Sequence, residues 1–185
     1  MVARTLLLVA LLGLAACQQV APAPTPSPSA TPEPTPLVAL RAPSAAVLAD
    51  ADVGRPRTAG RDHLTATEAA RDQPDEVLAL ELFSGWGWVD MATRTWGPVS
   101  VEVLQTLRPE GATRAYALWS GEAELAPFSA APCPASITGL EQCRYGSAAD
   151  RVIVVGRRDT LTFRLVADPG AAERLAALQA SRLRV

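Results

Sequence analysis

Residues 88–107 read WVDMATRTWGPVSVEVLQTL and carry the clearest β-sheet pattern in the chain. From Val99 to Val103, valines alternate with polar residues, which is typical of an antiparallel strand with one buried and one solvated face. Gly97-Pro98 separates this segment, residues 99–107, from a second strand-like segment, residues 88–96. The whole stretch therefore predicts a β-hairpin.

A second hairpin is predicted further along the chain. Val152–Val155 is a β-branched run without polar alternation, as expected of a central strand. Residues 156–159 read GRRD, which indicates a turn, and Thr160–Val166 then alternates between apolar and polar side chains. The two hairpins together predict an antiparallel sheet of about four strands.

Helical patterns surround these hairpins. Thr65 and Glu68 form a capping-box pattern, so a short helix should follow Thr65. Further helices are expected over residues 43–52, from Gln73 to the glycines at 85 and 87, over residues 112–121, and from Asp168 onward. Residues 53–63 are predicted to be a loop and residues 122–150 to be irregular. The order helix, hairpin, helix, hairpin, helix predicts an α+β domain with the helices packed on one face of the sheet.

The first 17 residues, MVARTLLLVALLGLAAC, have the features of a cleaved export signal. Arg4 supplies a positive charge, and the apolar run Thr5–Leu14 is too short to span a bilayer, which needs roughly 20 residues. The run leads into Leu14-Ala15-Ala16-Cys17, which resembles the lipobox of bacterial lipoproteins.

The lipoprotein resemblance implies a signal peptide over residues 1–16, cleavage before Cys17, and a diacylglyceryl group on the Cys17 sulfur. A further acyl chain, such as palmitate, is often added to the new amino group. Two or more chains anchor a protein stably, so a cell-envelope location with the membrane as partner is expected. The absence of Asp after Cys17 favours the outer membrane or cell surface over the inner membrane. The alternative is an ordinary secretory signal followed by a chance cysteine.

A proline-rich segment follows the lipobox. Residues 20–36 read VAPAPTPSPSATPEPTP, a composition that favours extended polyproline II and excludes helix or sheet. At about 3.1 Å per residue it would reach on the order of 50 Å. We therefore expect a disordered tether over residues 17–36 and a single globular domain over residues 37–185.

Composition and cysteine count narrow the function classes. The formal net charge of −2 gives no electrostatic footprint for nucleic acid. With Cys17 acylated, Cys133 and Cys143 are left to pair as a disulfide outside the cytoplasm. A redox pair is the alternative, although it would typically show Cys-x-x-Cys. The chain has one histidine, His63, so neither a zinc site nor another cofactor is expected.

Aromatic residues form the candidate ligand surface. Trp86, Trp88 and Trp96 share parity, so a continuous strand would place them on one face, and Tyr116 and Trp119 would share a helix face. Such a cluster could line a pocket for a sugar, a lipid or a hydrophobic peptide. The alternative is that these side chains fill the core.

Three functions follow from these patterns. The leading hypothesis is a stalked envelope lipoprotein whose domain binds a protein partner or another envelope component, such as a cell-wall component. The second is a small-ligand-binding lipoprotein that uses the tryptophan cluster. The third is a hydrolase, but no catalytic motif is found and no Gly-x-Ser-x-Gly elbow accompanies His63. An enzyme is therefore not expected.

Overall fold

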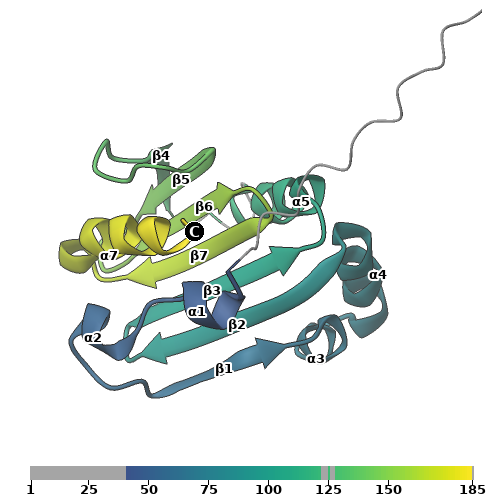
Figure 1. Cartoon of the computed structure of the whole chain (residues 1–185). Coiled ribbons are helices and arrows are strands. Elements are labelled where there is room, and N and C mark those ends of the chain that lie inside the picture. Colours follow the sequence, from purple (N-terminus) through teal and green to yellow (C-terminus); the bar gives the residue numbers. More distant parts are fainter. Residues whose placement is uncertain (1–40, 122–124, 126–127, 185) are drawn as a thin grey trace, which may run out of the picture. The chain divides into compact units, whose positions relative to one another are not determined.

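The computed structural model describes residues 41–121, 125 and 128–184. Within them, seven strands form one antiparallel sheet in the spatial order β1-β2-β3-β7-β6-β5-β4 (Figure 1). The strands are β1 (Ala59–Leu64), β2 (Trp88–Trp96), β3 (Val99–Thr106), β4 (Ser129–Pro132), β5 (Gln142–Ser147), β6 (Val152–Arg158) and β7 (Leu161–Ala167). The α+β class and the antiparallel sheet are thus confirmed.

Two of the described helices precede the first strand, one follows the last strand, and the others connect strands. They are α1 (Pro43–Ala46), α2 (Asp50–Val53), α3 (Ala66–Arg71), α4 (Glu76–Trp86), α5 (Pro109–Trp119) and α7 (Pro169–Arg182). The capping box predicted at α3 is present, because the Thr65 hydroxyl accepts a hydrogen bond from the Glu68 backbone N–H and Glu68 accepts one from Thr65 in return. Helix α5 begins earlier than predicted, with Pro109 in its first turn.

The predicted count of about four strands is wrong. The four expected strands form the centre of the sheet, and β1, β4 and β5 extend it on both sides. Most of strand β1 lies in residues 53–63, which were predicted to be a loop from Gly54, Pro56 and Gly60, and its sequence AGRDHL lacks alternating apolar residues. Both edge strands are largely exposed, and they are held by backbone hydrogen bonds to β2 and β5 more than by buried side chains.

Helices cover both faces of the sheet, so the prediction that they pack on one face is also wrong. On the side that we call the α7 face, Val101, Val103 and Leu165 pack in one cluster with residues of α1 and α7 (Figure 1). On the opposite side, the α5 face, Leu104 packs with residues of α4 and α5.

Thr162 illustrates why the second covered face was missed. It alternates with apolar residues along β7 and was therefore expected to face solvent. In the structure it is fully buried, and its hydroxyl donates a hydrogen bond to the Ala112 carbonyl oxygen of α5, 3.0 Å away. A satisfied hydroxyl can lie under a helix without a large cost, so polar alternation does not prove that a face is solvated.

A partly buried arginine, Arg94, holds the segment before β1 against the α7 face. Arg94 of β2 donates hydrogen bonds to the carbonyl oxygens of Ser44 and Leu48. Its guanidinium also pairs with Asp62 at 2.9 Å. The chain divides at Pro36 into two compact units, and all the described residues lie in the second unit, Leu37–Val185.

The predicted disulfide between Cys133 and Cys143 is confirmed. It links the chain just after β4 to β5, the strand that pairs with β4. Closing so short a loop contributes about 2 to 3 kcal/mol in the chain-entropy view. The disulfide therefore stabilises an edge of the sheet that has few buried side chains.

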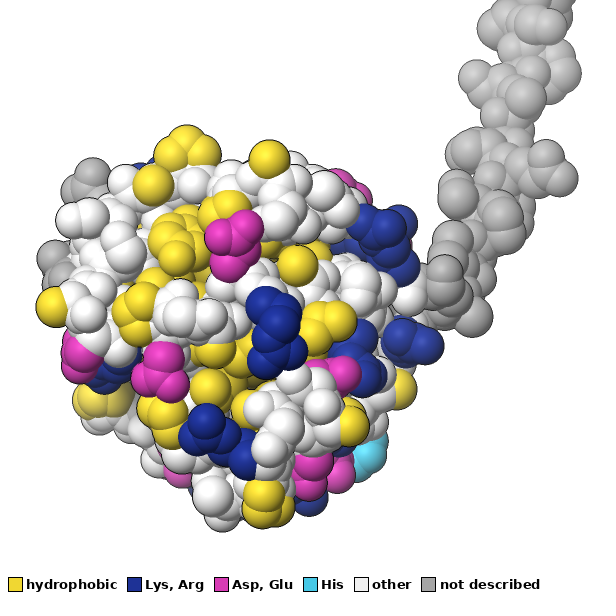
Figure 2. Space-filling view, turned by 90° about the vertical axis from the view of Figure 1, so that its left-hand side faces the viewer, with side chains coloured by type: hydrophobic (Ala, Val, Ile, Leu, Met, Phe, Trp, Pro, Cys, Tyr) yellow, Lys and Arg dark blue, Asp and Glu magenta, His cyan; other side chains and the backbone are white. Residues whose placement is uncertain are grey.

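Charged and apolar side chains are mixed on the surface of the domain. Arginine and acidic side chains are interspersed over the face in Figure 2, with hydrophobic side chains between them.

No helix in the described part of the chain is both long and apolar enough to span a membrane. The predicted signal peptide (1–16), the lipidation site Cys17 and the tether (17–36) lie outside the described residues.

Candidate functional site

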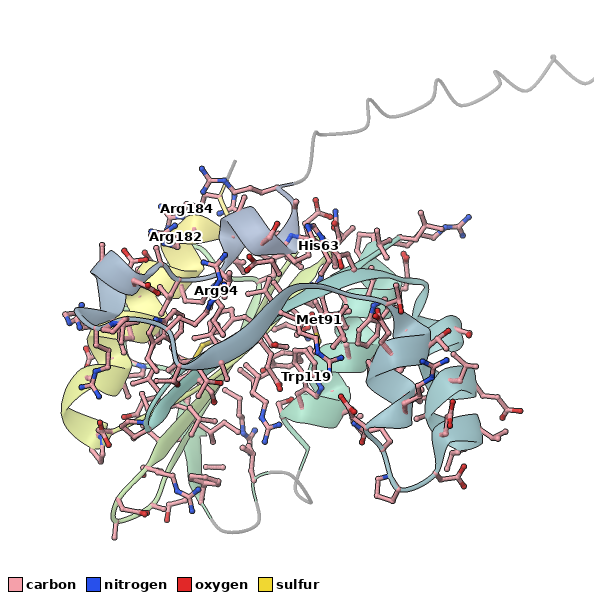
Figure 3. All side chains as sticks on the ribbon, turned by 90° about the horizontal axis from the view of Figure 1, so that it is seen from below. His63, Met91, Arg94, Trp119, Arg182 and Arg184 are labelled. Atoms are coloured by element: carbon pink, nitrogen blue, oxygen red, sulfur yellow. A yellow bond between two sulfur atoms is a disulfide. The ribbon has the colours of Figure 1, made fainter. Side chains whose placement is uncertain are left out.

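A hollow of about 170 Å³ lies on the α5 face, between the strands and helices α3, α4 and α5. We call it the aromatic hollow; it is lined by Ala69, Gln73, Phe83, Trp86, Trp88, Met91, Glu102, Leu118, Trp119 and Arg164. Figure 3 labels Met91 and Trp119, which lie near each other on this side of the sheet, whereas Arg94 lies on the side of α1 and α7. Side chains from six different elements therefore meet at one place.

One wall of the aromatic hollow consists of three aromatic rings that contact one another at tilted angles. Phe83 and Trp86 follow each other at helical spacing on the buried side of α4, with ring centres 5.3 Å apart. Gly87 then ends the helix in a left-handed conformation and turns the chain into β2. The turn brings Trp88 back against Phe83, with ring centres 4.7 Å apart.

Trp88 is fixed in this wall and is turned away from Trp96 by a β-bulge. Its indole N–H donates a hydrogen bond to the Leu64 carbonyl oxygen, 3.0 Å away. The pairing of β2 with β3 shifts register between Trp88 and Asp90, and such a bulge reverses the face on which the preceding side chain lies. The two tryptophans of β2 therefore lie on opposite faces of the sheet.

Trp96 belongs to the α7 face and to the core. It is fully buried, and its indole N–H donates a hydrogen bond to Asp50, 2.8 Å away. That hydrogen bond lowers the pKa of the Asp50 carboxyl. The interpretation of Trp86, Trp88 and Trp96 as one shared surface is thus wrong, because it assumed an unbroken strand and Trp86 lies in α4.

The opposite wall comes from the last turn of α5. Trp119 is half-buried and packs against both hydrophobic clusters of the α5 face, while its neighbour Leu118 is exposed at the rim. Tyr116 packs with Trp119 against Ile153 and Val155, outside the lining of the aromatic hollow, and burial raises the pKa of its hydroxyl. Tyr116 thus supports this wall from behind.

The floor of the aromatic hollow carries one carboxylate and one guanidinium group. Glu102 of β3 and Arg164 of β7 are register partners, and their charged atoms are 3.8 Å apart. Each side chain is about one-third exposed, 34% for Glu102 and 31% for Arg164. Both a hydrogen-bond donor and an acceptor are therefore accessible beneath the aromatic rings.

A groove of about 440 Å³ continues from the aromatic hollow toward β1. It shares Ala69, Gln73, Met91 and Glu102 with the hollow, so the two depressions adjoin along these side chains. Its remaining lining is mostly polar: Ala59, Gly60, Arg61, Leu64, Asp72, Thr93 and Thr95.

His63 lies in β1 rather than in the predicted loop. Its Nδ1 is 2.8 Å from Asp90 Oδ2, and Asp90 also accepts hydrogen bonds from the backbone N–H groups of Leu64 and Met91. His63 lines neither the hollow nor the groove, and none of its described interactions involves a serine or cysteine. The described residues likewise contain no group of three or more His, Cys, Asp or Glu side chains placed to hold a metal.

Helix α4 exposes a second apolar surface, which we call the α4 outer face. Val77 is 71% exposed, Leu78 is 60% exposed and Leu82 is 41% exposed. Phe83 and Trp86 fill the buried side of the same helix. A helix that is apolar on both sides usually has a covering partner.

No protein-family model matches the sequence, and no curated protein matches it either. The assignment of function therefore depends on the geometry of the aromatic hollow and the α4 outer face.

Sequence reasoning found only part of the aromatic hollow. Trp86, Trp88 and Trp119 were candidates, but Met91 and Glu102 were not. The one available signal was the polar position of Glu102 among the valines of β3. It becomes informative only with the long-range pairing of β3 and β7, which local pattern does not specify.

Proposed function

We propose that this chain is a lipid-anchored envelope protein, held through Cys17 and a proline-rich tether, whose domain binds a small ligand in the aromatic hollow. The anchor is supported by the lipobox pattern Leu14–Cys17 and the tether composition. Ligand binding is supported by one observation above all: the partly exposed rings of Trp88 and Trp119 line a concave site together with a paired carboxylate and guanidinium. Mostly apolar walls with a few convergent polar groups are the usual composition of ligand sites.

The pairing at the floor argues for binding rather than for structural packing. Glu102 and Arg164 lie on the face of the sheet that packs against helices, where apolar residues would contribute more to folding. Both side chains instead remain partly exposed next to Met91 and Trp119. An accessible polar pair beneath aromatic rings can orient a ligand while the rings supply contact area.

Thermal unfolding tests the proposal. A ligand that binds the folded domain raises its midpoint temperature by mass action. Soluble low-molecular-weight fragments from the envelope of the source organism should raise the midpoint of the wild-type full chain. Leu118→Ser, at the exposed rim, should reduce that increase, whereas Val77→Ser, on the α4 outer face, should not. An equal increase in both variants, or none in the wild type, would contradict the proposal.

Docking of a protein partner is a second candidate function. On the α4 outer face, Val77, Leu78 and Leu82 are exposed to solvent. Exposed apolar patches often mark protein–protein interfaces. The same Val77→Ser variant tests it, because loss of envelope partners in that variant alone would locate the interface on α4.

A further inference from the structure

The charges that line the aromatic hollow and the adjoining groove cancel. The charged groups of their described lining are Arg61, Asp72, Glu102 and Arg164. They stand as two opposite pairs, Arg61 with Asp72 at 3.7 Å and Glu102 with Arg164 at 3.8 Å. An anionic ligand would meet two carboxylates and a cationic ligand two guanidinium groups, so neither sign is favoured.

A wholly apolar ligand is disfavoured for a different reason. It would cover Glu102 and Arg164, each about one-third exposed, without replacing the water that solvates them. Removing water from an ion pair costs free energy unless new hydrogen bonds form. The ligand must therefore offer both donors and acceptors to the floor of the hollow.

Building on the proposed function, we infer that the ligand is a neutral glycan chain. A sugar ring has an apolar face of C–H groups, which fits the rings of Trp88 and Trp119. Its hydroxyl groups donate and accept, which matches the Glu102 carboxylate, the Arg164 guanidinium and the amide of Gln73. Neither the ligand nor the site needs a net charge for these contacts.

The dimensions favour a chain over a single sugar. The aromatic hollow, at about 170 Å³, is smaller than a typical drug-sized pocket of roughly 300 Å³ or more. It adjoins the groove of about 440 Å³, whose lining includes the side chains of Thr93, Thr95 and Gln73. One ring in the hollow and further units along this polar groove would use both depressions.

Isothermal titration of the purified full chain with defined probes tests this inference. The neutral probes are the tetramer of N-acetylglucosamine and maltotetraose, and the zwitterionic probe is trialanine. At least one neutral probe should bind, and its Kd should rise on the order of tenfold in Trp119→Ala. Leu118→Ser should also raise the Kd of that probe. This variant tests the same site if Trp119→Ala fails to fold. Val77→Ser should bind like the wild type.

Salt dependence provides an independent readout. Because a neutral ligand is not screened, its Kd should change less than about twofold between roughly 0.05 and 0.5 M NaCl. Binding of trialanine but of neither oligosaccharide would overturn the glycan inference and leave a ligand site in the hollow. Binding of no probe, together with no stabilisation by envelope fragments, would overturn both the inference and the proposed function.

Discussion

The side-chain amide of Gln179 on α7 and the backbone of Leu48 are joined by a buried hydrogen bond, with Leu48 N–H donating to Gln179 Oε1 at 3.1 Å. The Gln179 amide also donates from Nε2 to the Ala46 carbonyl oxygen at 2.9 Å. Gln179 is fully buried. One side chain thus satisfies a backbone donor and a backbone acceptor of the segment that enters the domain.

Replacing Gln179 should therefore destabilise the domain strongly. Gln179→Leu keeps the volume but leaves the Leu48 N–H and the Ala46 carbonyl buried without their partner, at a cost of about 2 to 4 kcal/mol. Urea unfolding measures this loss. The control is Ser181→Ala, an exposed position on the same helix, which should change the free energy of unfolding by less than about 0.5 kcal/mol. Equal values for the two variants would show that the hydrogen bonds of Gln179 are not needed for stability.

Two glycines of the α4–α5 region should respond in opposite ways to alanine. A Cβ at Gly111 would lie 1.8 Å from the Trp86 carbonyl oxygen, so Gly111→Ala must push α5 away from α4, and should cost about 1 to 3 kcal/mol. A Cβ at Gly85 would meet nothing within 4 Å. Gly85→Ala should be neutral or stabilising by up to about 1 kcal/mol, because alanine favours the helix. Chemical denaturation of both variants checks the prediction, and a loss of stability in Gly85→Ala would contradict it.

Asp62 should make the domain sensitive to acid. Hydrogen bonds from Arg94 lower the pKa of Asp62 below its ordinary value of 3.8, and the charge of Arg57 acts in the same direction. Because the folded pKa is depressed, the stabilising contribution is present above the unfolded value and is lost as the pH falls through the folded value.

The free energy of unfolding should therefore decrease more steeply between about pH 5 and pH 2 in the wild type than in Asp62→Asn. Urea titrations at a series of pH values provide the comparison. Parallel profiles for the two proteins would show that the interaction of Asp62 with Arg94 contributes nothing to the pH dependence.

The central part of the fold could be predicted from sequence because its strands carry their own signal. Valines alternate with polar residues through β3, and the capping residues Thr65 and Glu68 mark the start of α3. The edge strands β1 and β4 carry no such signal, since backbone pairing holds them and their side chains are mostly exposed. Local sequence pattern therefore predicts strands that bury side chains and misses those added at the edges.

The aromatic hollow was only partly predictable for two physical reasons. The bulge beside Trp88 changes the face of that side chain, and no single residue type marks a bulge. The pair Glu102 and Arg164 depends on β3 lying next to β7, although residues 107–160 separate the two strands along the chain. Contacts of that range are set by the whole topology.

The membrane anchor has a direct test. Cys17→Ala removes the thiol that the lipobox resemblance assigns to lipid attachment, and loss of two acyl chains removes most of the affinity for a bilayer. The variant should move from the membrane fraction to the soluble or secreted fraction, as followed by immunoblotting. Retention of Cys17→Ala in the membrane would show that the protein is held there by other means.

The most direct test of the central claim is photo-crosslinking in the intact envelope from two exposed positions. A photoreactive residue at Leu118 lies at the rim of the aromatic hollow, and one at Val77 lies on the α4 outer face. Our account predicts a crosslinked product from position 118 that decreases when Trp119→Ala is added, detected as a shift in mass of the purified protein. A product from position 77 with none from position 118 would contradict ligand binding in the hollow and would identify α4 as the working surface.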